Sequence, residues 1–149
     1  IMKKLKLISI LSLLFVLNVA SMCSDDDDTS TQVSNPTEIA STLADGQWIV
    51  TLYKENDVVQ TSNYSGYNFT FGADGALSAT NGSTTQSGDW STYTDSGYTK
   101  LDMMFTALDG PFEEISEDWR VISRTTTKIE LKHISGGDGS THYLTFEKD

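Results

Sequence analysis

The sequence predicts an all-β fold, an eight-stranded antiparallel up-and-down barrel. From Gln47 to Glu147, short stretches of alternating polarity follow one another and are separated by glycine-rich turns. No long helical period interrupts them. The chain has 149 residues, 38% of them hydrophobic, which suits one globular domain and excludes a multidomain enzyme.

The alternation divides this region into eight strands joined by seven short connections. The expected strands are 47–54, 67–72, 76–81, 86–93, 98–106, 119–125, 128–134 and 141–147. One face of each strand is apolar and should form the core: Trp48, Val50, Leu52, Tyr67, Phe69, Phe71, Leu77, Ala79, Trp90, Leu101, Met103, Phe105, Trp119, Val121, Ile129, Leu131, Leu144 and Phe146. Closing such a meander into a barrel removes its exposed edges.

The connections carry their own signals. Residues that tolerate positive φ predict turns at 73–75, 81–82, 95–97 and 136–139. The longest connection, 107–118, favours a turn and one short helical turn, with its acidic cluster facing solvent. Before the first strand, a cap-like Asn35 followed by Pro36 and Glu38 predicts a short helix to about Leu43, of two turns at most.

A secretory signal precedes the barrel. Lys3, Lys4 and Lys6 lead into an apolar run of about 14 residues, shorter than the roughly 20 that span a bilayer. Cys23, the single cysteine, follows this run, and its place resembles that of the lipidated cysteine in bacterial lipoprotein signals. The next residues are similar to the acidic export signal of lipoproteins from Bacteroidota-type bacteria: Ser24, Asp25, Asp26, Asp27 and Asp28.

These resemblances imply a domain plan and a location. Residues 1–22 form the signal peptide, 23–42 an acidic flexible tether after lipidated Cys23, and 43–149 the barrel domain. Acyl chains on Cys23 would anchor the protein in the outer membrane, facing the cell surface. Ten Lys and Arg against 21 Asp and Glu give a net charge of −11, which excludes nucleic acid as a partner.

Several motifs of the barrel region together resemble a family. Gly46-Gln47-Trp48 is similar to the Gly-x-Trp opening of lipocalins. A lipocalin-like domain of small bacterial lipoproteins is closer, and the resemblance covers residues 43–149. The matching stretches that follow the opening are 67–75, Gly88-Asp89-Trp90, 118–121 and 129–132. The family resemblance implies a barrel that binds a small apolar or amphipathic ligand, and it makes Arg120 or Arg124 the candidate for the arginine that covers the opening tryptophan.

The interior volume decides whether such a ligand fits. An eight-stranded barrel is either just filled by its side chains or holds one small ligand. The inward set contains three tryptophans and several phenylalanines, and Ala79 is its clearly small member. A largely filled barrel is favoured, in which Trp48, Trp90 and Trp119 either line a ligand site or plug the barrel.

One polar constellation follows from the last hairpin. If Leu131 pairs with Leu144, the same register places His133 opposite His142 on the inward face, beside Asp138 in the turn. These three residues are the candidates for a metal site, and the two histidines for a pH-sensitive pair. A wet barrel mouth that needs no ligand is the favoured interpretation, and no cofactor is predicted.

Nothing in the sequence indicates an enzyme. The thiol is expected to be acylated, no Ser-His-Asp spacing is recognisable, and no glycine loop precedes a helix. Glu113, Glu114, Glu117 and Asp118 share one acidic loop without a desolvating pocket. The first hypothesis is therefore a surface-anchored binder of a small apolar or amphipathic ligand. The alternative is a filled barrel that serves as a protein-interaction or accessory module of a cell-envelope complex, through loops such as 107–118.

Overall fold

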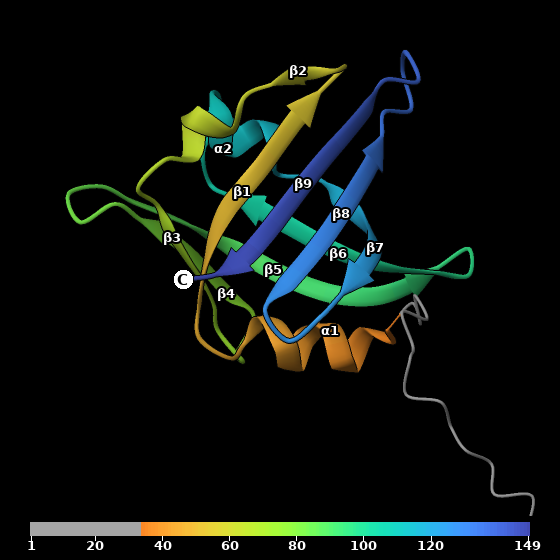
Figure 1. The fold of residues 1–149 in the computed structure, drawn as a ribbon, viewed down its shortest axis with the longest axis horizontal. Helices are drawn as coiled ribbons and strands as arrows, with labels where there is room; N and C mark the ends of the chain where they lie inside the picture. Colours follow the sequence, from red (N-terminus) through yellow and green to blue (C-terminus); the bar gives the residue numbers. More distant parts are fainter. Residues whose placement is uncertain (1–33) are drawn as a thin grey trace, which may run out of the picture. The chain divides into compact units, whose positions relative to one another are not determined.

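A closed antiparallel barrel forms the described part of the chain, residues 34–149 of the computed structural model (Figure 1). Its elements are α1 (Pro36–Leu43), β1 (Gln47–Glu55), β2 (Val58–Val59), the 3-10 helix η1 (Thr61–Tyr64), β3 (Asn68–Phe71), β4 (Ala76–Thr80), β5 (Thr85–Asp95), β6 (Tyr98–Phe105), α2 (Pro111–Glu114), β7 (Asp118–Arg124), β8 (Lys128–Ile134) and β9 (Thr141–Lys148). Strand β1 pairs with β3, the strands from β3 to β9 pair in chain order, and β1 pairs with β9 to close the sheet. The predicted eight-stranded up-and-down barrel is confirmed, and the two-residue β2 is an addition paired to the end of β1.

The predicted signal peptide, Cys23 and the acidic run 24–28 lie outside the described residues. In the part of the chain that the structure describes, no helix has the length and apolar character needed to span a membrane.

The interior follows the predicted alternation except in β1. Most of the expected inward residues are buried, including Phe69, Leu101 and Phe146 at 0% exposure. The register between β1 and β9 shifts between Val50 and Leu52, which is a β-bulge. The extra residue reverses the alternation, so Leu52 is only partly buried and Tyr53 takes the inward position at 0% exposure. The expectation that Leu52 belongs to the core is therefore wrong.

Helix α1 lies across the end of the barrel at which β1 begins (Figure 1). The Asn35 side chain caps it by accepting the Glu38 backbone N–H at 3.0 Å, and Pro36 occupies its first turn. Ile39 and Leu43 are fully buried beneath it. The predicted short helix is thus present, and it packs as part of the folded unit. The helix supplies Ile39 and Leu43 to the core cluster, and the expected domain boundaries stay a prediction.

Arg124 attaches α1 to the barrel wall. Its Nε donates to Ser34 Oγ at 2.6 Å and its Nη1 to Thr42 Oγ1 at 3.0 Å, while Nη2 lies 3.5 Å from Glu38 Oε2. Among the described residues, neither arginine candidate makes a cation–π contact with the opening tryptophan. Lys148 Nζ lies 5.7 Å from the centre of the Trp48 ring instead.

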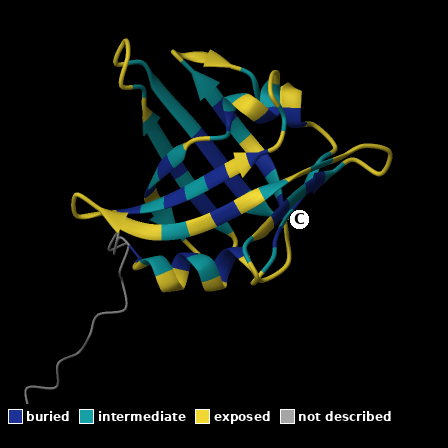
Figure 2. Ribbon diagram, turned by 180° about the vertical axis from the view of Figure 1, so that it is seen from behind, coloured by how far each residue is buried: buried dark blue, intermediate teal, exposed yellow. Residues whose placement is uncertain are grey.

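The opposite end of the barrel is closed by η1 and α2. Tyr64 donates its hydroxyl hydrogen to the Pro111 carbonyl at 2.7 Å, which ties the two helices together. Phe112 enters the core from α2, and its ring centre lies 4.9–6.1 Å from those of Tyr64, Tyr67, Phe69 and Phe105. Figure 2 shows the resulting division, with buried residues along the middle of the strands and exposed residues at the hairpin tips.

Phe112 is therefore expected to be essential to the stability of the closed end. We predict that Phe112→Ala lowers the free energy of unfolding by about 3–5 kcal/mol, because a large buried ring leaves a cavity. Urea unfolding followed by circular dichroism measures the change. Leu108→Ala in the same connection is the control: Leu108 is 95% exposed, so its truncation should change stability by less than about 0.5 kcal/mol. An equal effect of both substitutions would contradict the role of Phe112 as the side chain that closes this end of the barrel.

Candidate functional site

The three tryptophans lie inside the barrel wall and not at a surface hollow. Trp48 and Trp119 are 0% exposed and Trp90 is 9% exposed. Each indole N–H donates to a backbone carbonyl: Trp48 to Leu43 at 2.9 Å, Trp90 to Gly72 at 2.9 Å and Trp119 to Ile115 at 3.0 Å. Two of these carbonyls, those of Leu43 and Ile115, belong to the segments that close the barrel ends. The indoles thus belong to the packed core, and both a ligand role and a plug role for them stay predictions.

Beyond the core, the inward face turns polar at the end closed by α2. Four titratable residues each lie two positions from a buried core residue. They are Glu55 on β1, His133 on β8, His142 on β9 and Glu117 just before β7. Backbone pairing brings three of these together, since His142 pairs with His133 on β8 and with Glu55 on β1. The expected His133–His142 pairing is confirmed, with ring centres 5.9 Å apart.

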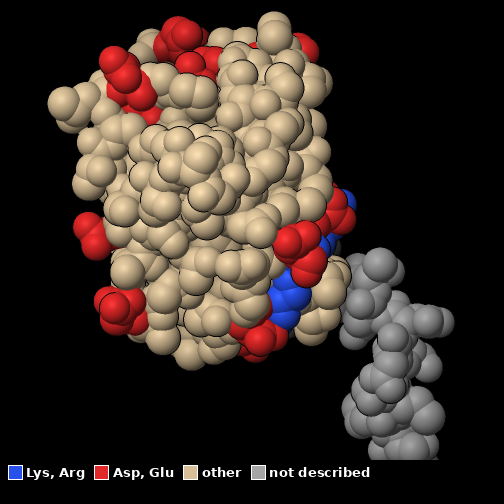
Figure 3. All heavy atoms as spheres, turned by 90° about the vertical axis from the view of Figure 1, so that its left-hand side faces the viewer, with Lys and Arg blue, Asp and Glu red and all other residues tan. Residues whose placement is uncertain are grey.

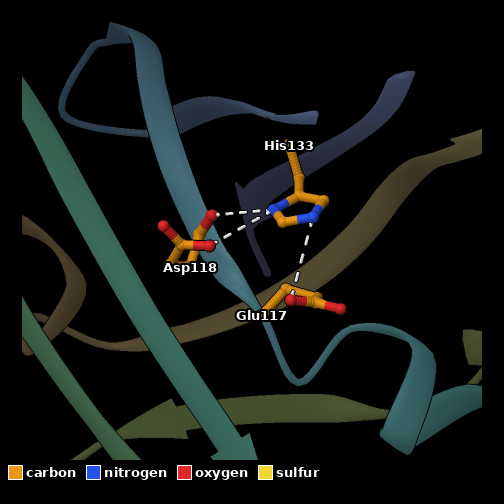
Figure 4. A group of neighbouring side chains, drawn as sticks. All are labelled: Glu117, Asp118 and His133. Carbon is orange, nitrogen blue, oxygen red and sulfur yellow. Dashed lines mark hydrogen bonds and ion pairs between the residues drawn. The ribbon is translucent and has the colours of Figure 1, made fainter. Parts of the chain in front are cut away.

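His133 lies between two acidic residues (Figure 4). Its Nδ1 is 3.0 Å from the Asp118 carbonyl oxygen and 3.4 Å from Asp118 Oδ1, and its Nε2 is 3.8 Å from Glu117 Oε2. A carbonyl oxygen only accepts hydrogen bonds, so Nδ1 must carry the hydrogen. In the neutral ring, Nε2 is then the basic nitrogen, and it faces the Glu117 carboxylate.

Three further polar atoms at this end are buried without a hydrogen-bond partner among the described residues. They are the Tyr53 hydroxyl oxygen, Glu114 Oε2 and His142 Nδ1. Burial raises the pKa of Tyr53 above its ordinary value, and the nearby charges of Glu55 and Glu114 raise it further. The phenol therefore stays protonated and offers a hydrogen-bond donor to the cluster. We name this set, Tyr53, Glu55, Glu114, Glu117, Asp118, His133 and His142, the mouth cluster.

Asp138 does not join the metal-binding group that the sequence suggested. Its carboxylate accepts the Ser140 backbone N–H at 2.9 Å, and this hydrogen bond lowers the pKa of Asp138. It is held by its own turn, whereas Glu117 and Asp118 contribute the carboxylates near His133. The sequence offered one signal for Glu117: it lies two residues before inward-facing Trp119, and alternation carries it toward the same face.

A second feature crosses the outer face of the barrel. Backbone pairing aligns Lys100 with Arg120, Arg120 with Lys132, Lys132 with Tyr143, and Tyr143 with Lys54. The guanidinium carbon of Arg120 lies 3.5 Å from the Tyr98 ring centre, and the Tyr143 ring has Lys54 Nζ at 5.7 Å and Lys132 Nζ at 5.8 Å. We name this set of six residues on five adjacent strands the cation–tyrosine row.

Two cations of this row have no acidic partner among the described residues. Lys100 pairs with Asp118 at 2.8 Å and Lys54 with Asp57 at 3.0 Å. Within residues 34–149, Arg120 and Lys132 form no ion pair, although the whole chain has a net charge of −11.

A different side of the molecule is largely uncharged, with acidic groups around its margin and basic atoms along one edge (Figure 3).

Hollows of the surface lie beside the row and beside α1. One of about 320 Å³ is lined by Arg120, Val121, Ile122, Lys132 and Tyr143. A second, of about 180 Å³, is lined by Tyr98, Lys100, Asp118, Arg120, Lys132, His133 and Ile134. The largest of the three, about 610 Å³, lies outside the barrel between α1 and Arg124. None of the three is lined by a tryptophan.

Comparisons with known proteins support the fold. No family model matches the chain, and no curated protein matches it significantly. A DUF4847 family protein from Bacteroides vulgatus ATCC 8482, known from its crystal structure, is similar in three dimensions. The two share 16% sequence identity at a TM-score of 0.50, over 74% of this chain and 97% of that chain. The chain thus has the same kind of barrel. At this sequence identity, the similarity concerns the fold alone.

Buried indoles make a measurable prediction. We expect the tryptophan fluorescence of the protein to resist acrylamide quenching and to stay unchanged when an apolar dye such as anilinonaphthalene sulfonate is added, because the inward positions are already filled. Phe112→Ala, which opens a cavity, should increase dye fluorescence and serves as the positive control. Strong dye binding with energy transfer from tryptophan in the unsubstituted protein would show an open apolar cavity.

Proposed function

We propose that the chain is a lipid-anchored protein of the bacterial outer membrane, without enzymatic activity, whose lipocalin-like barrel is an interaction module for an acidic segment of a partner protein. The observation that carries the proposal is the pair Arg120 and Lys132, adjacent cations that form no ion pair within residues 34–149, in an acidic chain. The acidic run after Cys23 and the apolar leader before it support the anchor and the surface location.

The cation–tyrosine row lowers the stability of the isolated barrel. Like charges directly opposite on neighbouring strands destabilise a sheet, and Lys100, Arg120 and Lys132 face one another in succession. The tyrosine rings offset part of this repulsion through cation–π contacts. A bound carboxylate would remove the rest, because Arg and Lys form charge-assisted hydrogen bonds with it.

The chemistry beside the row fits a protein segment. Ile122 and Tyr143 line the same hollow as Arg120 and Lys132. Ile122 and Ile134 on the same strands are exposed, at 36% and 58%. A surface that combines cations with apolar and aromatic groups is typical of protein interfaces. An acidic peptide with apolar side chains between its carboxylates matches it.

Filled inward positions favour this function over a container for an apolar ligand. Phe69, Phe71, Phe105, Phe112 and Phe146 pack with the tryptophans in one core cluster. Both barrel ends are covered, by α1 on one side and by η1 with α2 on the other (Figure 1). An interior ligand would have to displace these rings, whereas the outer face needs no rearrangement.

The row is tested with a fluorescent Glu-rich peptide that contains leucines. We expect the double variant Arg120→Gln, Lys132→Gln to bind it at least about tenfold more weakly than the unsubstituted protein at low salt, because two charge-assisted contacts are lost. The matched control is Lys128→Gln, Lys148→Gln, which removes the same charge from cations outside the row. Fluorescence anisotropy measures both affinities. Equal losses in the two variants would reduce the effect to net charge and contradict a defined site.

The anchor is tested separately in cells of a Bacteroidota-type bacterium. We expect the unsubstituted chain to fractionate with the outer membrane and Cys23→Ser to leave it, because the acyl chains supply the attachment. Metabolic labelling with an alkyne fatty acid should mark the first and not the second. Replacing Asp25–Asp28 by asparagine keeps Cys23, so it should retain the label and reduce only exposure to added protease at the cell surface. An unlabelled wild-type protein would refute lipidation.

A further inference from the structure

Buried polar atoms without partners gather at the mouth cluster. Leaving such an atom unpaired costs about 1–3 kcal/mol, so native proteins satisfy it with water or an ion. Tyr53 is 0% exposed, yet its hydroxyl has no partner among the described residues, and the same holds for Glu114 Oε2 and His142 Nδ1. Backbone pairing places His142 beside both His133 and Glu55, and His133 Nε2 lies 3.8 Å from Glu117 Oε2, so these polar groups share one end of the barrel.

The histidine geometry has the form of a metal ligand already held in place. In metal sites, the histidine nitrogen that does not bind the ion usually donates to a carbonyl or carboxylate oxygen. His133 Nδ1 makes this contact with the Asp118 carbonyl oxygen at 3.0 Å, and Asp118 Oδ1 is 3.4 Å away. His133 Nε2 is left facing Glu117 Oε2 at 3.8 Å (Figure 4). Only a small closure would bring these two atoms to the spacing of ligands on one ion.

His142 supplies the second nitrogen. It lies directly across the strand pair from His133, and the ring centres are 5.9 Å apart. Two imidazoles on one tetrahedral ion have ring centres separated by about 5–6 Å, given metal–nitrogen bonds of about 2.0–2.1 Å. The Nε2 atom of His142 already has Ser140 Oγ at 3.1 Å, whereas its Nδ1 is the buried atom without a partner.

We propose that the mouth cluster binds a divalent transition-metal ion of the zinc type, with His133 Nε2 and the neighbouring Glu117 carboxylate as ligands already in place. His142 Nδ1, which lies outside the group of candidate donor atoms found within 4.8 Å of one another, would complete the set by a movement of its side chain. Two imidazoles and one carboxylate are a donor set that zinc prefers, and calcium and magnesium, which take oxygen ligands, do not. The Tyr53 hydroxyl and the Glu114 carboxylate would hydrogen-bond a water molecule on the fourth position. Glu117 has 46% side-chain exposure, which gives the ion a path from solvent.

Such an ion would bind three parts of the chain at once, whereas backbone pairing connects each strand only to its neighbours. His133 is on β8, His142 is on β9, and Glu117 ends the long connection that contains α2. Binding to the folded state alone stabilises it by mass action. The ion would therefore lock α2 and its Phe112 plug over the barrel end.

The test uses the full chain, treated with a chelator and then titrated with zinc chloride against a competing chromophoric chelator. We expect one equivalent to bind tightly and to raise the Tm, and His133→Ala or His142→Ala to weaken that binding at least about tenfold. Asp138→Asn, which removes a carboxylate of the same hairpin outside the cluster, is the matched control and should bind as the unsubstituted chain does. The acidic run 24–28 also carries carboxylates, and replacing its aspartates by asparagine should leave the tight site intact.

Cobalt provides a second readout that does not depend on variants. Tetrahedral Co²⁺ with nitrogen ligands gives intense visible absorption bands, whereas cobalt on scattered surface carboxylates stays octahedral and pale. Intense bands that zinc abolishes would support the site. Pale spectra, or histidine variants that bind zinc as tightly as the Asp138→Asn control, would overturn it. If a histidine variant fails to fold, the cobalt spectrum of the unsubstituted chain still decides.

Discussion

The pairing of β1 with β9 is the constraint on which the rest of the structure depends. It closes the sheet, so each strand residue faces either a confined interior or the outside, and successive residues alternate between the two. The interior is small and is filled by aromatic rings. Polar residues that the alternation directs inward therefore find room only at the ends, where the mouth cluster lies. Cations that it directs outward are aligned across strands by the same pairing, which produces the cation–tyrosine row.

Both barrel ends are covered, but in different ways. At the α1 end, hydrogen bonds donated by the side chains of Trp48 and Arg124 hold a capped helix against the strands. At the α2 end, one phenylalanine and one tyrosine do most of the closing, and unpaired polar atoms lie beside them. The first end is satisfied by protein groups alone. The second leaves buried polar atoms without partners among residues 34–149, which is the physical reason that it, and not the α1 end, carries the case for a bound ion.

The sequence predicted the strands well because alternation and turn residues are local signals. It placed His133 opposite His142 by extending the register of Leu131 and Leu144, and that register holds. It failed at Leu52, because a bulge reverses alternation without leaving a mark in composition. It missed the plug residues Tyr64 and Phe112, which come from irregular connections where no period applies. The cation–tyrosine row could not be predicted either, because it depends on four successive registers, and a shift of one residue in any of them would disperse it.

Asp118 connects the two polar features across the barrel wall. Its Oδ2 accepts from Lys100 Nζ at 2.8 Å at one end of the row, while its carbonyl oxygen and Oδ1 face His133 Nδ1 in the mouth cluster. One residue at the start of β7 thus takes part in both networks. If binding at the cation–tyrosine row moves Asp118, the contact of Asp118 with His133 in the mouth cluster changes as well, and the reverse also holds. Such a coupling is reciprocal by thermodynamic necessity. An anion that competes for Lys100 would free the Asp118 carboxylate for His133, and an ion held by His133 would fix Asp118 and, through it, Lys100. One shared residue, Asp118, therefore links the outer face to the barrel mouth, and the link needs no long path through the core.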